Sequence, residues 1–135
     1  MKLPVSTDQL PLETEPWDDS VVYHGLLKAF NISSKLDKNG NNYGSVEFEV
    51  LEPEEKRGRK ITDNYISIPP EIDDTMSDRQ KKAMLELGVR LARLAASCKI
   101  SAEDTDDLIG GEASFTIKNE EYQGRILPKI AEYLI

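Results

Sequence analysis

One segment of the chain has helical hydrophobic periodicity and lies among segments with strand periodicity; this combination restricts the fold more than any other feature. Between Ser77 and Cys98, apolar residues recur at steps of three and four, which is the spacing of one helix face. They are Met84, Leu87, Leu91, Leu94 and Cys98. Ser77 and Gln80 have the spacing of a capping box, in which each side chain bonds the backbone amide of the other residue. The pattern predicts one helix over 77–98, with a basic, solvent-facing side formed by Arg79, Lys82, Arg90 and Arg93.

Strand patterns lie on both sides of this helix. Residues 43–51 alternate between apolar and polar side chains, so Val46, Phe48 and Val50 are expected on one buried face. The other expected strands are residues 21–34, 60–68, 112–118 and 125–134. In the first of these, the apolar face is expected to consist of Val22, Leu26, Phe30 and Ile32. Pro128 fits an edge or bulge position, because proline cannot donate a ladder hydrogen bond.

The elements therefore follow one another in the order β-β-β-α-β-β. This is the order of the OB-fold, a small, partly open Greek-key barrel of five strands, although the order alone does not determine which strands pair. The expected fold class is mainly β (α+β), with a five-stranded OB-fold-like barrel as a single domain over residues 21–135. Residues 1–20 contain one cation, five anions and three prolines. We expect them to form an extended acidic arm that docks through Leu10, Leu12 or Trp17.

The formal net charge of −8 argues at first against a nucleic-acid partner. The charges are unevenly distributed, however. Beyond the arm, the negative excess lies in residues 70–76 and 100–111, whereas residues 21–69 are balanced and residues 77–99 hold six cations and two anions. A nucleic-acid site is therefore compatible with the sequence if it lies on a local basic face.

Residues suited to catalysis or metal binding are sparse. His24 is the single histidine, and Cys98 lies on the apolar helix stripe, where a thiol is usually inert. Asp37 begins a run that resembles a calcium loop, but Asn42 stands at the sixth position, where such a loop needs glycine, and Phe48 replaces the glutamate at the twelfth. The chain also has no glycine-rich phosphate loop. We therefore expect no enzyme activity, metal or cofactor.

Binding of single-stranded nucleic acid requires cations along the phosphates and aromatic faces on which bases stack. In OB-folds the ligand lies across the second and third strands and against the loops that join strands 1–2 and 4–5. The tyrosines and cations in and near these elements are the candidate nucleic-acid-binding residues: Lys28, Lys35, Lys38, Tyr43, Lys56, Arg57, Arg59, Lys60, Tyr65, Tyr122 and Arg125.

The same residues also have structural interpretations. Tyr43 and Tyr122 fit the cross-strand aromatic pairs of ordinary hairpins. Tyr65 is predicted to face outward because it is out of phase with Ile66 and Ile68 if those face the core, but it could instead be a barrel residue whose hydroxyl lies at the rim. The basic residues 56–60 adjoin three glutamates and could form a solvated loop.

Three short motifs resemble a known family. They are Gly44-Ser45-Val46-Glu47-Phe48-Glu49-Val50-Leu51, Gly58-Arg59-Lys60-Ile61, and Asp106-Asp107-Leu108-Ile109-Gly110 before the last hairpin. They are similar to small bacteriophage proteins, long catalogued as a family of unknown function, which resemble single-stranded-DNA-binding proteins of phage replication and recombination cassettes. The resemblance covers about residues 21–135 and implies an OB-fold that binds single-stranded DNA without a cofactor.

We therefore expect a largely sequence-tolerant, single-stranded-DNA-binding protein of phage DNA replication or recombination. The alternative is a protein-interaction module that docks a recombinase, a polymerase or a host factor through its acidic surface. The sequence has no signal peptide and no membrane-spanning stretch, which favours the cytoplasm, that of the host if the gene is phage-encoded. Edge strands and the apolar C-terminal residues 133–135 leave a homo-oligomer open.

Overall fold

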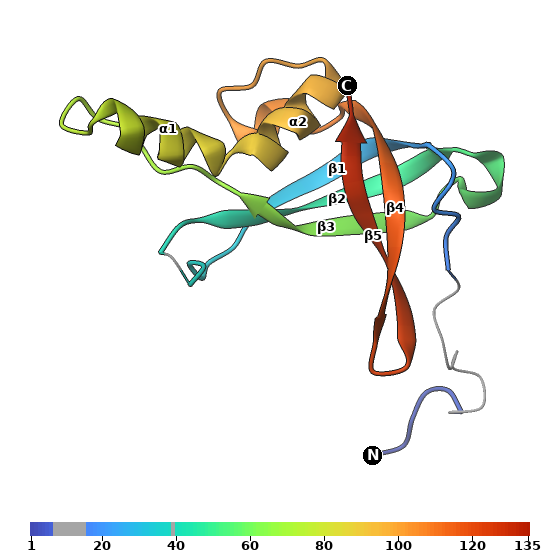
Figure 1. The fold of residues 1–135 in the computed structure, drawn as a ribbon. Helices are drawn as coiled ribbons and strands as arrows, with labels where there is room; N and C mark the ends of the chain where they lie inside the picture. Colours follow the sequence, from blue (N-terminus) through green and yellow to red (C-terminus); the bar gives the residue numbers. More distant parts are fainter. Residues whose placement is uncertain (7–15, 39) are drawn as a thin grey trace.

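The computed structural model describes residues 1–6, 16–38 and 40–135. Within these residues the protein is mainly β, of the α+β class, with a five-stranded antiparallel sheet and two α-helices between its third and fourth strands. The elements are β1 (Tyr23–Ile32), β2 (Tyr43–Glu52), β3 (Lys60–Ser67), α1 (Asp78–Glu86), α2 (Val89–Cys98), β4 (Glu112–Tyr122) and β5 (Arg125–Leu134). The strand order is β3-β2-β1-β4-β5 (Figure 1). No helix in the described part of the chain is long and apolar enough to cross a membrane.

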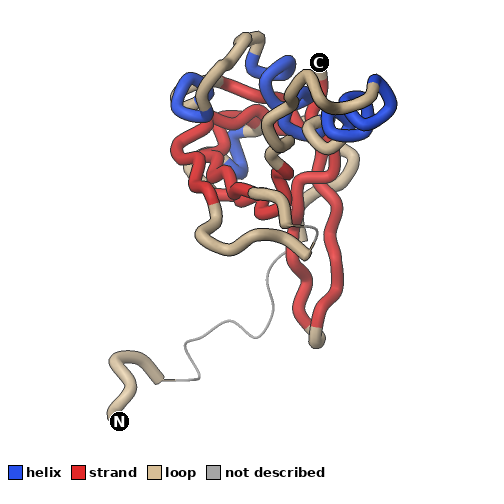
Figure 2. Tube along the Cα trace, turned by 90° about the vertical axis from the view of Figure 1, so that its left-hand side faces the viewer, coloured by secondary structure: helices blue, strands red, loops and turns tan. Residues whose placement is uncertain are grey.

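The β4–β5 hairpin runs across the other strands and projects beyond them (Figures 1 and 2). β1 pairs with β4 only from Tyr23 to Leu26, so no further strand is hydrogen-bonded to the outer half of the hairpin. Gln123 and Gly124 form its turn with positive φ angles of 50° and 76°, which two-residue hairpin turns require. α2 packs against β3, β4 and β5. The hairpin tip and the β1–β2 loop both project on the side away from the helices.

The prediction of one helix over 77–98 is wrong, because the segment forms two helices. The capping box is present, with Gln80 N bonded to Ser77 Oγ at 3.2 Å and Ser77 N bonded to Gln80 Oε1 at 2.9 Å. The break falls at Leu87 and Gly88, whose amides bond back only three residues. A Cβ on Gly88 would lie 3.2 Å from the Pro69 ring, so this position is packed closely against the chain that follows β3. Glycine is also among the weakest helix formers, and the helix ends there.

The predicted apolar face of the first strand is largely wrong. Tyr23, Leu27 and Phe30 are buried, whereas Val22 and Ile32 are 45% and 48% exposed. Leu26 is only half-buried, and Phe30 alone was assigned correctly. A bulge between residues 27 and 29 shifts the alternation by one residue, so the buried face continues from Leu27 to Phe30. Ile32 has the phase of Phe30 but is the last residue of the strand and is exposed.

The predictions for β2 and for Pro128 are confirmed. Val46, Phe48 and Val50 are fully buried, and Pro128 lies in β5, which is an edge of the sheet. Aromatic rings from several strands meet around Phe48, with the centroids of Phe48 and Phe115 5.2 Å apart. The core therefore lies between β2, the β4–β5 hairpin and α2.

Trp17 anchors the segment before β1, as the sequence suggested. Its side chain is 8% exposed and its ring centroid lies 5.3 Å from that of Tyr23. The Asn119 side chain of β4 accepts from Trp17 N at 3.0 Å and donates to Trp17 O at 2.7 Å. The other two suggested anchors, Leu10 and Leu12, lie outside the described residues.

Candidate nucleic-acid interface

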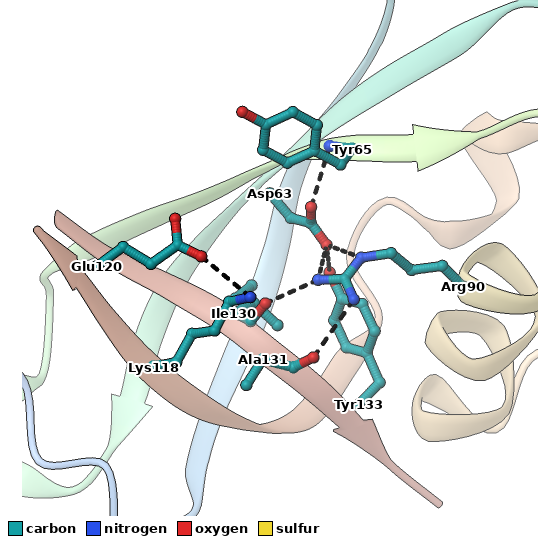
Figure 3. Close-up of polar contacts among 8 residues, drawn as sticks. All are labelled: Asp63, Tyr65, Arg90, Lys118, Glu120, Ile130, Ala131 and Tyr133. Atoms are coloured by element: carbon teal, nitrogen blue, oxygen red, sulfur yellow. Dashed lines mark hydrogen bonds and ion pairs between the residues drawn. The ribbon is translucent and has the colours of Figure 1, made fainter. Parts of the chain in front are cut away.

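Tyr65 lies at the centre of the candidate interface. It belongs to β3, where Ile66 is fully buried while the Tyr65 side chain is 67% exposed. The Tyr65 amide donates to Asp63 Oδ1 at 3.1 Å, and its ring points away from the polar cluster behind it (Figure 3). The predicted outward phase of Tyr65 is confirmed, and one aromatic face is available to solvent.

A hollow of about 380 Å³ lies beside Tyr65 on the side of the β1–β2 loop. Lys38 and Tyr43 line it together with Tyr65. Tyr43 begins β2 and is half-buried, and its carbonyl accepts a hydrogen bond from Ser33 N at 2.8 Å. The structure thus brings two of the predicted tyrosines and one predicted lysine to one site.

A second hollow of about 220 Å³ lies on the other side of Tyr65, between β3 and the β4–β5 hairpin. Lys118, Glu120 and Lys129 line it, and Lys129 Nζ lies 5.3 Å from the centre of the Tyr65 ring. The Glu120 carboxylate contacts Lys118 Nζ at 3.1 Å and Lys129 Nζ at 2.8 Å. The two ammonium groups, Lys129 first, hold the pKa of Glu120 below its usual value, and the Glu120 carboxylate raises the pKa of Lys129.

The predicted residues Tyr122 and Arg125 lie at the tip of the same hairpin. They are directly opposite each other across the turn, and Tyr122 is 64% exposed. Because alternate residues of a strand share a face, the register places Tyr122 on the face of Lys118 and Glu120. We call the resulting surface, from the β1–β2 loop to the hairpin tip, the tyrosine strip. It consists of Lys38, Tyr43, Tyr65, Lys118, Glu120, Tyr122, Arg125 and Lys129.

Sequence reasoning missed Lys118 and Lys129, since their position depends on strand pairing. The sequence does contain a signal that could have identified these two lysines. If Gln123 and Gly124 form a two-residue turn, counting back from it places Lys118 opposite Lys129, which is the register of the structure.

All the other predicted cations except Lys35 lie away from the tyrosine strip; Lys35 is next to Leu36, which lines the first hollow. The cluster at the β2–β3 turn, formed by Lys56, Arg57, Arg59 and Lys60, adjoins the opposite end of the ten-residue strand β2 from Tyr43. At about 3.4 Å per residue, the length of β2 is roughly 30 Å.

Two of these cations have other contacts. Lys56 Nζ lies over the Trp17 ring at 5.5 Å, and Lys60 Nζ pairs with Glu47 at 3.3 Å. Lys28 is exposed on β1, two strands away from Tyr65, and Lys35 is exposed in the β1–β2 loop. The structure therefore does not gather the predicted cations into one surface.

A buried polar cluster holds β3 beside β5 behind the tyrosine strip (Figure 3). Asp63 of β3 is 3% exposed, and its Oδ2 accepts from Arg90 Nε at 2.7 Å and from the Tyr133 hydroxyl at 2.8 Å. Arg90 Nη2 also donates to Ile130 O at 2.8 Å. We call Asp63, Arg90 and Tyr133 the clasp. It joins β3, α2 and β5, and it holds Tyr65 next to the lysines of the hairpin.

The clasp corrects the prediction for Arg90, which was expected on the solvent-facing side of the helix. The side chain is instead 31% exposed and points to the sheet. Because the helix breaks at Gly88, the helical periodicity of α1 does not continue into α2. A cation inside a protein needs a partner of opposite charge, and the buried Asp63 carboxylate is the partner of Arg90.

The two residues considered for catalysis have different neighbours. His24 Nδ1 lies 2.7 Å from Ser114 Oγ, while Cys98 is half-buried and burial raises the pKa of its thiol to about 11. Among the described residues, no three His, Cys, Asp or Glu side chains are close enough to hold a metal ion together.

Neither the comparison with models of known protein families nor the comparison with curated protein sequences gives a match for this chain. The functional argument therefore depends on the site. Exposed and half-buried tyrosine rings lie there beside ammonium and guanidinium groups, an arrangement that suits a ligand with flat, uncharged parts and anionic parts.

Proposed function

We propose that the protein binds single-stranded DNA, with little sequence preference, along the tyrosine strip. The observation that carries this proposal is the position of Tyr65, which is exposed between two hollows that each contain a lysine. Bases stack on aromatic side chains regardless of sequence, while cations bind the phosphates between them. Tyr43 and Tyr122 offer further stacking surfaces on either side of Tyr65.

The strand order and the clasp are arguments for the proposal of an OB-fold-like barrel. β3 and β5 are the two ends of the strand order, and the clasp links them through side chains. In this interpretation the loops flanking the tyrosine strip correspond to the two loops that contact oligonucleotides in OB-folds. The motifs that resemble the bacteriophage family agree with it, and we place the activity in phage DNA replication or recombination in the host cytoplasm.

The net charge of −8 does not oppose this site, because the tyrosine strip has a local excess of cations. It contains Lys38, Lys118, Arg125 and Lys129 against the carboxylate of Glu120 and that of Asp37, which lines the hollow beside Lys38. Stacking contributes about 1–3 kcal/mol per base, so a strip of this kind needs few phosphate contacts.

The test is fluorescence anisotropy of a labelled oligo-dT at low and at higher salt. We expect binding that weakens with salt, and a roughly fivefold or larger loss of affinity in Tyr65→Ala, because about 1–3 kcal/mol of stacking is removed. Lys129→Ala should also weaken binding, whereas the matched control Lys60→Ala, at the far end of β2, should not. Absence of binding at low salt, or equal affinities of Tyr65→Ala and the wild-type protein, overturns the proposal.

A hollow on the other side of the molecule favours protein docking as a second candidate function. It has a volume of about 410 Å³, lies between the two helices and the segment after α2, and has an apolar lining that includes Leu85 and Leu91. Glu103 and Asp104 also line it. An apolar peptide segment with basic flanking residues would complement this surface. The proposed source of such a segment is a recombinase, a polymerase or a host factor.

Two substitutions of equally exposed leucines test the second function. Leu85 is 61% exposed at the hollow, and Leu36 is 58% exposed beside the tyrosine strip. A partner that binds the wild-type protein and Leu36→Glu but not Leu85→Glu supports docking at the hollow. Equal recovery by both variants contradicts it.

A further inference from the structure

The β4–β5 hairpin places two lysines directly opposite each other. Lys118 and Lys129 are register partners, and like charges in this position destabilise a sheet. Both side chains reach solvent, with exposed fractions of 58% and 33%. The Glu120 carboxylate lies between the two ammonium groups and neutralises part of their charge. The hairpin therefore has a two-lysine anion site that is filled by a carboxylate of the protein itself.

We propose that Lys118 and Lys129 form a phosphate-binding subsite of the tyrosine strip, and that Glu120 occupies this subsite until a backbone phosphate displaces it. This inference rests on the proposed binding of single-stranded DNA and adds the residues that bind a phosphate and the group that competes with it. Glu120 thereby sets the affinity of the tyrosine strip.

The position of Tyr65 supports a phosphate at this point. Lys129 Nζ lies over the Tyr65 ring, and the hollow that contains the lysines is bounded by that ring. A nucleotide whose base stacks on Tyr65 would direct its phosphate toward the same hollow. Thr62 and Asn64 of β3 add polar groups to its lining.

Displacement of Glu120 requires little free energy. Its carboxylate is 42% exposed, and exposed ion pairs add little stability because water solvates the separated groups well. The lysines also hold the pKa of Glu120 below its usual value. Glu120 thus remains an anion at neutral pH, and it leaves by rotation of its side chain and not by protonation.

The chain offers a matched control for this inference. Glu121 is the next residue in β4, is exposed, and lies opposite Ile126 on the other face of the hairpin. Glu120→Gln and Glu121→Gln change the net charge equally, but only the first frees the two lysines. Any effect of the bulk charge of the protein therefore appears in both variants.

In the oligo-dT experiment, Glu120→Gln should bind roughly threefold to tenfold more tightly than Glu121→Gln at low salt. Its affinity should also decrease more steeply with salt. The slope of the logarithm of the affinity against the logarithm of the salt concentration should change by up to about 0.7, the value for one phosphate contact with a single strand. Lys118→Ala and Lys129→Ala should weaken binding and make the slope shallower. Thermal unfolding of each variant checks that the hairpin is intact.

Inorganic tripolyphosphate, measured by calorimetry, tests the subsite without DNA. Tighter binding to Glu120→Gln than to Glu121→Gln supports the subsite even if oligo-dT does not bind, in which case only the proposed function fails. Binding of oligo-dT with the same affinity to both glutamine variants overturns the subsite and leaves the proposed function standing.

Discussion

The Tyr133 hydroxyl of β5 donates a hydrogen bond of 2.8 Å to the buried carboxylate of Asp63 in β3. These residues lie on the two end strands of the sheet, which share no backbone pairing in the described part of the chain. Arg90 of α2 binds the same carboxylate oxygen. The two ends of the sheet are therefore held together by a charged side-chain cluster, and this cluster lies directly behind Tyr65.

Replacement of Asp63 should reduce stability strongly. Asp63→Ala leaves the Arg90 guanidinium and the Tyr133 hydroxyl without their shared acceptor, and removal of one partner of a buried ion pair typically costs about 3–5 kcal/mol. Because the Arg90 side chain is 31% exposed, we expect the lower part of this range. Urea unfolding measures the change.

Glu132→Ala is the matched control for Asp63→Ala. Glu132 pairs with Arg93 at 3.1 Å, but the two side chains are 60% and 41% exposed. Such a surface pair contributes no more than about 1 kcal/mol. Similar losses of stability in the two variants would contradict the role assigned to the clasp.

The clasp also predicts a dependence of stability on alkaline pH. Burial, followed by the negative charge of Asp63, raises the pKa of Tyr133 above its ordinary value of 10.0. Above that pH the unfolded chain releases this proton while the folded protein retains it. The unfolded state then binds fewer protons, so stability decreases as the pH rises.

Unfolding of the wild-type protein and Tyr133→Phe in urea, from about pH 9 to about pH 11, isolates this contribution. The wild-type protein should lose stability more steeply, by as much as about 1.4 kcal/mol per pH unit. Parallel pH profiles for the two proteins would show that Tyr133 ionises in the folded state as readily as in the unfolded chain.

Local patterns in the sequence predicted those parts of the fold that depend on local interactions. The capping box of Ser77 and Gln80 and the alternation of Val46, Phe48 and Val50 each involve residues within one element. The helix break falls at Gly88, where the Pro69 ring lies close from outside the helix, whereas the apolar spacing of the sequence continues across this position. The facing of β1 depends on a bulge, and the sequence does not mark its position.

In the candidate site, too, the sequence could place some residues and not others. Tyr65 could be placed outward because Ile66 next to it is apolar and belongs to the core. Lys129 could be found only through the hairpin register. Asp63 shares the phase of the buried Ile61, but an irregularity of the β2–β3 register separates this phase from that of Ile66, and the sequence does not mark it. The basic cluster at the β2–β3 turn was selected for its composition, although the predicted strand over 43–51 already places this turn at the far end of that strand from Tyr43.

Asn119 should control the docking of Trp17. Its side-chain amide makes two hydrogen bonds with the backbone of Trp17, so Asn119→Ala should lose about 1–3 kcal/mol of stability. Trp17 is the single tryptophan of the chain, and its fluorescence emission should shift to longer wavelength as the ring becomes exposed. Asn31→Ala, at an exposed position of β1, is the control and should leave the emission unchanged. An unchanged spectrum in Asn119→Ala would show that ring packing alone holds Trp17.

Cys98 should be almost unreactive in the folded protein. Burial raises the pKa of its thiol from 9.0 to about 11, which lowers the reactive thiolate fraction near pH 8 about a hundredfold. The rate of reaction with Ellman's reagent should therefore be at least about a hundredfold lower in the folded protein than in urea. A Cys98→Ala protein carrying Ser101→Cys provides an exposed thiol three residues away, which should react rapidly without urea. Equal rates for Cys98 in the folded and unfolded protein would contradict its burial against the sheet.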